Sequence, residues 1–151
     1  MADALAPEVV SLSIPSRLEL LVVLDRAALA ICEHMEFDAD ACSQISMAVI
    51  EAGTNAVQHG HMRDPARTFD TRFLMYPDRL EIEVRDSGTG FDAQLARPDI
   101  TTPEHLMDNR GRGIFIMRAC CDRVDFDFGP TGTLCRLVKN RTATAQRAAD
   151  V

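Results

Sequence analysis

Two short glycine-containing segments carry groups that could hold a ligand. Asp86-Ser87-Gly88-Thr89-Gly90 stands at the end of an expected strand. Because Gly88 and Gly90 have no side chain, the backbone can approach a ligand closely, and the Asp86 carboxylate can accept hydrogen bonds from an amine. Gly111-Arg112-Gly113 opens an expected helix, and the free amides of a helix N-terminus can bind phosphate. Each segment alone is weak evidence, because a tight turn closed by an aspartate also explains the first one.

A third candidate lies on an expected helix, and a fourth lies at the start of an expected strand. Glu51 and Asn55 are four residues apart, so on a helix they share one face at a separation of about 6 Å along the axis. They flank the apolar stripe of that helix, which places them at the margin of the core beside the sheet. A solvated helix face also explains this pair, and Gly132-Thr133 is uninformative alone.

The segments around these candidates differ in periodicity, from which the elements can be predicted. Apolar residues recur at helical spacing in two stretches and at alternate positions in several others, and one further run is nearly all apolar. The predicted strands cover 9–14, 69–75, 80–84, 124–128 and 133–139, and the predicted helices cover 16–36, 38–60 and 113–121. The nearly continuous apolar run predicts that the third helix is buried.

Side chains that can cap helices support these boundaries. Ser16-Arg17-Leu18-Glu19 has the Ser-x-x-Glu form of a capping box. Asp38 or Asp40 can cap the second helix. Gly53 stands inside that helix at a cost of about 1 kcal/mol relative to alanine, which indicates close packing there.

Strands with one apolar face need one covering layer, and three helices can supply it. We therefore predict an α+β fold, a two-layer sandwich in which helices cover one face of a mixed, mainly antiparallel sheet. The length of 151 residues favours a single domain over 1–140, followed by a frayed tail at 141–151. Residues 92–110 contain two prolines and little periodicity, and a loop of that length is usually functional or mobile.

Composition argues against several classes of protein. The net charge of −7 disfavours binding to nucleic acid through phosphate neutralisation. No apolar run approaches the ~20 residues of a membrane span, and the N-terminus lacks the positive region of a secretion signal. The one lysine is Lys139, which Asn140 follows, so the chain has neither a P-loop nor the strand lysine of a protein-kinase core.

The cysteines and histidines have structural explanations. The five cysteines are odd in number, include an adjacent pair and form no Cys-x-x-Cys motif, which is typical of buried, reduced thiols in a cytoplasmic protein. His59 and His61 invite a zinc hypothesis, but a single helix end supplies both and no cysteine cluster lies near. His59 is better explained as a helix-end residue that interacts with the last carbonyls.

Together, the four candidates occur in a specific order along the chain. This order resembles that of the GHKL, or Bergerat-fold, ATP-binding domain. It consists of Glu-x-x-x-Asn on a helix, Asp-x-Gly-x-Gly after a hairpin, a long loop, Gly-x-Gly opening a helix and Gly-Thr entering a strand. Glu-Ala-Gly-Thr-Asn-Ala-Val-Gln-His-Gly and Gly-Arg-Gly-Ile-Phe-Ile-Met look most like the anti-sigma-factor serine/threonine kinases of bacterial partner-switching systems. The similarity covers roughly Leu12 to Lys139.

This resemblance implies ATP and Mg²⁺ as cofactors and a role for each polar candidate. Asn55 would hold Mg²⁺, which bridges the phosphates, and Glu51 would be the general base toward the attacking hydroxyl. Asp86 would accept a hydrogen bond from the adenine amino group, with Thr133 supporting it directly or through water.

The glycines and the long loop also take roles from the resemblance. Gly88 and Gly90 would let the backbone pass under the nucleotide. Gly111, Arg112 and Gly113 would close over the phosphates, with residues 92–110 forming a lid.

The resemblance further implies a cytoplasmic homodimer that binds a sigma factor and phosphorylates a small anti-anti-sigma antagonist on serine or threonine. The alternative is a regulatory module that binds ATP and a partner without phosphotransfer, and retention of Glu51 favours the kinase. A gyrase-like or chaperone-like ATPase would need a transducer domain, which this chain lacks. Neither a nucleic acid nor a membrane is expected as a direct partner.

Overall fold

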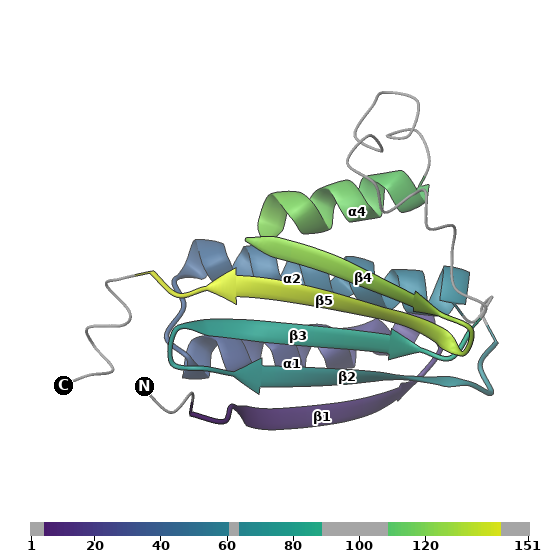
Figure 1. The fold of residues 1–151 in the computed structure, drawn as a ribbon, viewed down its shortest axis with the longest axis horizontal. Coiled ribbons are helices and arrows are strands. Elements are labelled where there is room, and N and C mark those ends of the chain that lie inside the picture. The colour runs from purple at the N-terminus through teal and green to yellow at the C-terminus, as the bar shows by residue number, and fades with distance from the viewer. Residues whose placement is uncertain (1–4, 61–63, 89–108, 143–151) are drawn as a thin grey trace.

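The computed structural model describes residues 5–60, 64–88 and 109–142. They form a five-stranded sheet with the order β1-β2-β3-β5-β4 (Figure 1). Its strands are β1 (Glu8–Pro15), β2 (Thr68–Met75), β3 (Arg79–Asp86), β4 (Arg123–Gly129) and β5 (Gly132–Asn140). Every pair of neighbouring strands is antiparallel, so the described part of the sheet is antiparallel throughout rather than mixed.

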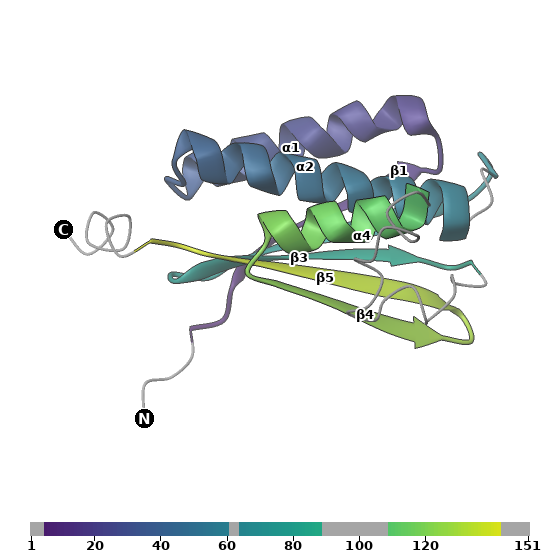
Figure 2. The same cartoon turned by 90° about the horizontal axis from the view of Figure 1, so that it is seen from above.

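Three helices lie on one face of this sheet, and the opposite face is uncovered by any described element (Figure 2). They are α1 (Leu21–His34), α2 (Ala39–Asn55) and α4 (Asn109–Cys120). A 3₁₀ turn, η1 (Leu18–Leu20), precedes α1, and a π-helical segment, η2 (Ala56–Gly60), continues α2. The predicted two-layer α+β sandwich is confirmed. No helix in the described ranges is long and apolar enough to cross a membrane.

The connections explain why neighbouring strands run in opposite directions. α1 and α2 are antiparallel, so together they return the chain to the end of the sheet where β1 finished, and β2 runs back along β1 (Figure 1). Short turns join β2 to β3 and β4 to β5, and such turns require antiparallel partners.

The core lies between the sheet and the helices, with α2 packed between α1 and α4. Alternate residues of β2, among them Phe69 and Phe73, are fully buried beneath the helices. Close packing at Gly53 is confirmed, because a Cβ atom placed there would lie 2.8 Å from Cδ2 of Leu21 and 2.9 Å from Cδ2 of Leu24. α1 and α2 can therefore approach closely at this point.

The helix ends follow the sequence signals only in part. Asp38 caps α2, since its side chain accepts a hydrogen bond of 2.7 Å from the Ala41 amide. The predicted capping box at Ser16 does not start a helix. The N-cap positions of η1 and α1 are Arg17 and Leu20, and neither makes a side-chain capping bond. The chain enters this helix through a 3₁₀ turn instead, while the Ser16 amide bonds to the Arg67 carbonyl at 2.8 Å.

The third helix is longer and less completely buried than predicted. α4 begins at Asn109, inside the segment expected to be a loop, and Gly111 and Gly113 lie in its first turns. Ile114 and Met117 are fully buried, but Phe115 is 42% exposed. An apolar run therefore overstated the burial of α4, which packs through one face only.

Two remaining predictions concern the tail and the cysteines. Arg141 is held against the β2–β3 turn, where its amide bonds to the Asp78 carbonyl at 2.8 Å and its guanidinium bonds to the Pro77 carbonyl at 3.0 Å. The rest of the expected tail, from 143, lies outside the described residues, and the division into domain and tail stays a prediction.

All five cysteines are free thiols, and four of them are buried, as predicted.

Candidate functional site

Four elements meet at one end of the molecule. α2 runs towards this end through η2, and α4 starts from it (Figure 1). β3 finishes and β5 begins at the same end, where Asp86 is paired with Thr133 across the two strands. Candidates that are far apart in sequence therefore gather at this end.

Glu51 and Asn55 lie one helical turn apart and line a cavity of about 310 Å³ between α2 and α4. Asn55 is only 6% exposed, and Glu51 is half-buried. The other lining residues are Thr54, Gln58 and His59 from α2 and η2, and Arg112, Gly113 and Ile116 from α4. The pair is thus part of a concave site and not of a solvated helix face.

The first turns of α4 pack directly against the Glu51 carboxylate. A Cβ atom placed on Gly113 would lie 2.7 Å from Oε2 of Glu51 and 3.8 Å from Oδ1 of Asn55. Burial raises the pKa of Glu51 above its usual value, and the positive charge of Arg112 opposes this rise. A carboxylate with a raised pKa is a stronger proton acceptor than one in water.

Asp86 is buried and oriented by the backbone around it. Its Oδ1 accepts hydrogen bonds from the Gly88 amide at 3.1 Å and from the Thr133 amide at 3.4 Å. The exposed fraction of Asp86 is 6%. These bonds hold the carboxylate in one place at the end of β3, where it can serve as a hydrogen-bond acceptor.

Three glycines make this arrangement around Asp86 possible. A Cβ atom on Gly60 would lie 2.4 Å from Cγ of Asp86, and one on Gly88 would lie 1.4 Å from the Gly60 carbonyl oxygen. Gly132 has a φ of +147°, and a Cβ atom there would lie 1.8 Å from the Asp86 carbonyl oxygen. η2, the end of β3 and the start of β5 are therefore in backbone contact, which side chains would prevent.

The predicted site residues form two groups in the structure. Glu51, Asn55, Arg112 and Gly113 line one cavity. The group around Asp86 does not line it. Gly60 connects the two groups. It is the last residue of η2, which continues α2 directly after Asn55, and it packs on the Asp86 carboxyl.

Some predictions fall partly or wholly on residues that are not described. Gly90, His61 and most of the expected lid, 92–108, lie outside the described residues, so their roles stay predictions. Gly111 is buried at the start of α4. Among the described residues, no cluster of three potential metal-binding His, Cys, Asp or Glu side chains occurs.

Several site residues were missed by the sequence reasoning. Thr54 and Gln58 follow Glu51 by three and seven positions, which is the spacing of one helix face, so periodicity could have found them. His59 was interpreted as a helix-end residue, yet it lines the cavity. The contact of Gly60 with Asp86 joins segments 26 residues apart and has no local signal.

Buried polar atoms test whether a nucleotide would fit here. Among the described residues, Nδ2 of Asn55 and Oγ1 of Thr133 are buried and have no hydrogen-bond partner. Unsatisfied buried groups are rare in native proteins, and they are a recognised sign of a missing ligand or ion. Thr71 and Arg136 also have such atoms outside the site, but one lies in each group of site residues, and both can donate to a ligand that accepts hydrogen bonds, as a nucleotide does.

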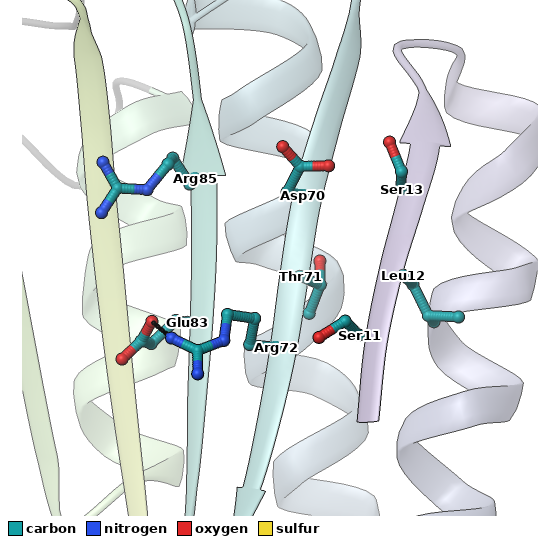
Figure 3. Close-up of a pocket in the computed structure, with 8 residues that line it drawn as sticks. All are labelled: Ser11, Leu12, Ser13, Asp70, Thr71, Arg72, Glu83 and Arg85. Atoms are coloured by element: carbon teal, nitrogen blue, oxygen red, sulfur yellow. Dashed lines mark hydrogen bonds and ion pairs between the residues drawn. The ribbon is translucent and has the colours of Figure 1, made fainter. Parts of the chain in front are cut away.

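A larger hollow, of about 470 Å³, lies on the uncovered face of the sheet and contains none of these residues (Figure 3). Half of its eight lining residues are charged, and an ion pair of 3.4 Å joins Arg72 on β2 to Glu83 on β3. Arg136 on β5 contacts the same glutamate at 3.4 Å. Charges paired across neighbouring strands in this way are typical of a solvated sheet face.

Comparison with protein families matches residues 14–139 to the histidine kinase-like ATPase domain. The chain belongs to this family. The match includes every candidate of both groups, and the GHKL fold predicted from the motifs is thereby confirmed. Membership in an ATPase family implies ATP binding, and the implied Mg²⁺ has support from the family alone.

Curated relatives of this family member have been assigned as protein kinases. The serine-protein kinase RsbW of Bacillus licheniformis is 30% identical over 140 residues, which span 88% of each chain. The enzyme of the same name from Bacillus subtilis (strain 168) is 30% identical over 120 residues, covering 76% of this chain and 75% of the relative.

One solved structure supports the fold. The crystal structure of the RsbU and RsbW domains of a Mycobacterium tuberculosis protein superimposes with a TM-score of 0.66. The match covers 90% of this chain but 34% of that one, at 15% sequence identity. At this identity the similarity concerns the fold alone.

Proposed function

We propose that this family member is an ATP- and Mg²⁺-dependent serine/threonine protein kinase. It acts as an anti-sigma factor and phosphorylates a small anti-anti-sigma protein. The position of Glu51 carries the proposal, because its carboxylate lies in the same cavity as Asn55 and Arg112, against the first turns of α4. The relatives named as serine-protein kinases support the reaction type.

Each group of site residues would bind one part of the nucleotide. Asp86 accepts a hydrogen bond from the adenine amino group, and the Thr133 hydroxyl, buried without a partner among the described residues, completes its contacts there. Gly88 and Gly90 keep the backbone free of side chains beside the base. At the other end, the amides of Gly111 to Gly113 and the Arg112 guanidinium face the phosphates.

Chemistry would take place in the cavity between α2 and α4. Asn55 offers its amide oxygen to Mg²⁺, whose charge offsets that of the phosphates. Glu51 accepts the proton of a serine or threonine hydroxyl as that oxygen attacks the terminal phosphoryl group, the bond between the β- and γ-phosphates breaks and ADP leaves. Half-burial of Glu51 keeps water from competing fully for its carboxylate, and Arg112 helps it to stay ionised.

The proposed partners follow from the same family. We propose a sigma factor as the sequestered protein, an anti-anti-sigma protein as the phosphoryl acceptor, and a cytoplasmic homodimer as the working form. The net charge of −7 is in keeping with protein partners and unfavourable for direct contact with nucleic acid.

The test separates nucleotide binding from phosphotransfer. Small anti-anti-sigma proteins encoded in the same genome are incubated with the kinase and γ-labelled Mg·ATP, and label on protein is counted. Glu51→Gln should reduce transfer by ~10²–10⁴ while nucleotide affinity holds steady or rises. Glu33→Gln, at an exposed position on α1, is the matched control and should leave both quantities unchanged.

The alternative is a module that binds ATP and a partner without transferring phosphate. Thr54, Gln58 and His59, which line the cavity, are equally compatible with binding alone. Tight ATP binding with no label transferred to any candidate acceptor, or full transfer by Glu51→Gln, would favour this second function.

A further inference from the structure

Gly113 has a neighbour that its phosphate-closing role does not explain. The atom nearest to the position of its missing Cβ is Oε2 of Glu51, at 2.7 Å, followed by Cδ of Glu51 at 3.7 Å and Oδ1 of Asn55 at 3.8 Å. Real Cβ atoms are not found this close to an oxygen, so the carboxylate occupies space that any other residue at 113 would fill. The contact joins α4 to the proposed base across the helix–helix boundary.

We propose that Gly113 is a positioning residue for the general base, and the proposal rests on the phosphotransfer function described above. By having no side chain, Gly113 lets the Glu51 carboxylate lie against the first turns of α4, within the cavity that Arg112 also lines. A β-carbon at 113 would displace the carboxylate from this position but would keep the backbone amides that face the phosphates, because alanine retains its own amide.

The charges around Glu51 favour the observed position. Arg112 precedes Gly113 and lowers the pKa of Glu51 through its positive charge, while burial acts in the opposite direction. α4 also presents its N-terminal end here, where a helix stabilises negative charge. From α2, the neutral amide of Asn55 faces the same space. The carboxylate is therefore attracted to the first turns of α4, and the glycine provides the room.

Two features keep a substitution at this position from destroying the fold. The group that an alanine would meet is the end of a flexible side chain, which can rotate away, and not the backbone or the core. Alanine is also favoured over glycine within a helix by about 1 kcal/mol. Gly113→Ala should therefore fold at least as well as the wild type and differ from it in where the Glu51 carboxylate lies.

The experiment compares Gly113→Ala with Gly129→Ala, the same chemical change at an exposed glycine outside both groups, where a Cβ atom would meet only the Gly132 carbonyl oxygen at 3.6 Å. Calorimetry gives the affinity for Mg·ATP, and labelled transfer to the anti-anti-sigma protein at saturating ATP gives the rate. We expect Gly113→Ala to keep its affinity for Mg·ATP within about twofold and to transfer phosphate about 10–100-fold more slowly. Displacement of a catalytic group by ~1 Å can reduce a reaction rate by this factor. Gly129→Ala should leave both the rate and the affinity unchanged.

A double substitution tests whether the effect passes through Glu51. Glu51→Asp shortens the side chain by one methylene and withdraws its oxygens from position 113. In the Glu51→Asp background we expect Gly113→Ala to change the rate by less than about threefold, because there is no longer a contact to break. Equal losses in both backgrounds would overturn the proposal, as would a parallel loss of affinity and rate in Gly113→Ala.

The wild-type protein distinguishes failure of this inference from failure of the function. An active wild type with an equally active Gly113→Ala variant would overturn the positioning role alone. A wild type that binds Mg·ATP but transfers no phosphate to any acceptor would overturn the proposed function, and the role of Gly113 with it.

Discussion

Two threonines in different parts of the structure have a buried hydroxyl group without a hydrogen-bond partner among the described residues. Thr71 on β2 is 0% exposed and Thr133 at the start of β5 is 3% exposed, and Oγ1 of each has no hydrogen-bond partner among the described residues. The first is buried on β2 in alternation with Phe69 and Phe73, and the second lies beside Asp86. Their local chemistry is the same, so a comparison of the two isolates what the site adds.

Valine at either position should raise the free energy of unfolding by about 1 kcal/mol, because it keeps the shape and removes an unsatisfied polar atom. Thr133→Val should also weaken ATP binding by about 1 kcal/mol or more, whereas Thr71→Val should leave it unchanged. Urea denaturation and calorimetry on both variants measure these effects. Unchanged ATP affinity in Thr133→Val would remove the hydroxyl from the proposed site.

The raised pKa of Glu51 predicts a pH-dependent cost in stability. Because burial disfavours the charged form, the folded protein loses stability relative to a neutral variant as pH rises through the folded pKa of Glu51. Glu51→Gln should therefore be more stable than the wild type at neutral pH. The difference should vanish below the usual glutamate value of 4.5, where both states of the wild type are protonated.

Denaturation at several pH values, with the exposed Glu33→Gln as the control, measures this difference. Phosphotransfer should show the complementary dependence and fall as pH drops through the same raised pKa, because protonated Glu51 cannot accept the substrate proton. A stability difference that grows toward acid pH would contradict the burial effect.

At the scale of elements, two glycines inside helices have different neighbours, so substitution by alanine should have different effects at the two positions. Gly53 faces the packed side chains of Leu21 and Leu24 across the α1–α2 contact. Leu24 is 0% exposed, so it has little freedom to move. In contrast, the flexible end of a partly exposed glutamate faces Gly113.

Gly53→Ala should therefore lower the free energy of unfolding. Overpacking typically costs ~1–3 kcal/mol, which exceeds or matches the gain of ~1 kcal/mol in helix propensity. We expect a net loss of about 1 kcal/mol by urea denaturation. Ser43→Ala, at an exposed position on the same helix, should be neutral or slightly stabilising. A Gly53→Ala protein more stable than the wild type would show that α1 and α2 can separate at little cost.

Elements with a strong period could be predicted from the sequence, and their ends could be predicted less well. The stripe of α2 and the alternation of β2 and β3 follow from local spacing, which is why their positions are correct. The capping box at Ser16 failed because the chain enters α1 through a 3₁₀ turn, while the Ser16 amide is bonded to Arg67 on a distant segment. An apolar composition alone did not reveal which face of α4 is buried.

At the scale of the whole molecule, the site depends on contacts between segments remote in sequence. The motif order predicted the site residues and identified the family. It could not predict that Glu51 and Gly113 touch or that Gly60 packs on Asp86, because these contacts arise only when η2, α4 and the end of β3 meet (Figure 1). The cavity between α2 and α4 has the same origin. Function therefore depends on the placement of the helix layer on the sheet.

A ligand that joins both groups of site residues should stabilise the whole fold. At a concentration of ~100 times its dissociation constant, ATP should add about 2.7 kcal/mol to the free energy of unfolding. For a chain of this length we expect a rise in melting temperature of roughly 5–10 °C in the presence of Mg²⁺. GTP at the same concentration should give almost none, because guanine places a carbonyl where the Asp86 carboxylate requires a donor.

Asp86→Asn tests this link with little damage to the fold, because the amide oxygen can still accept from the Gly88 and Thr133 amides. The Asp86→Asn variant should lose most of the ATP-dependent rise in melting temperature. Arg72→Gln removes the ion pair with Glu83 on the uncovered face of the sheet, opposite the helix layer, and should keep the full shift (Figure 3). Differential scanning fluorimetry with each nucleotide measures all of these values. Equal shifts for ATP and GTP in the wild type, or a full ATP shift in Asp86→Asn, would remove Asp86 from adenine recognition.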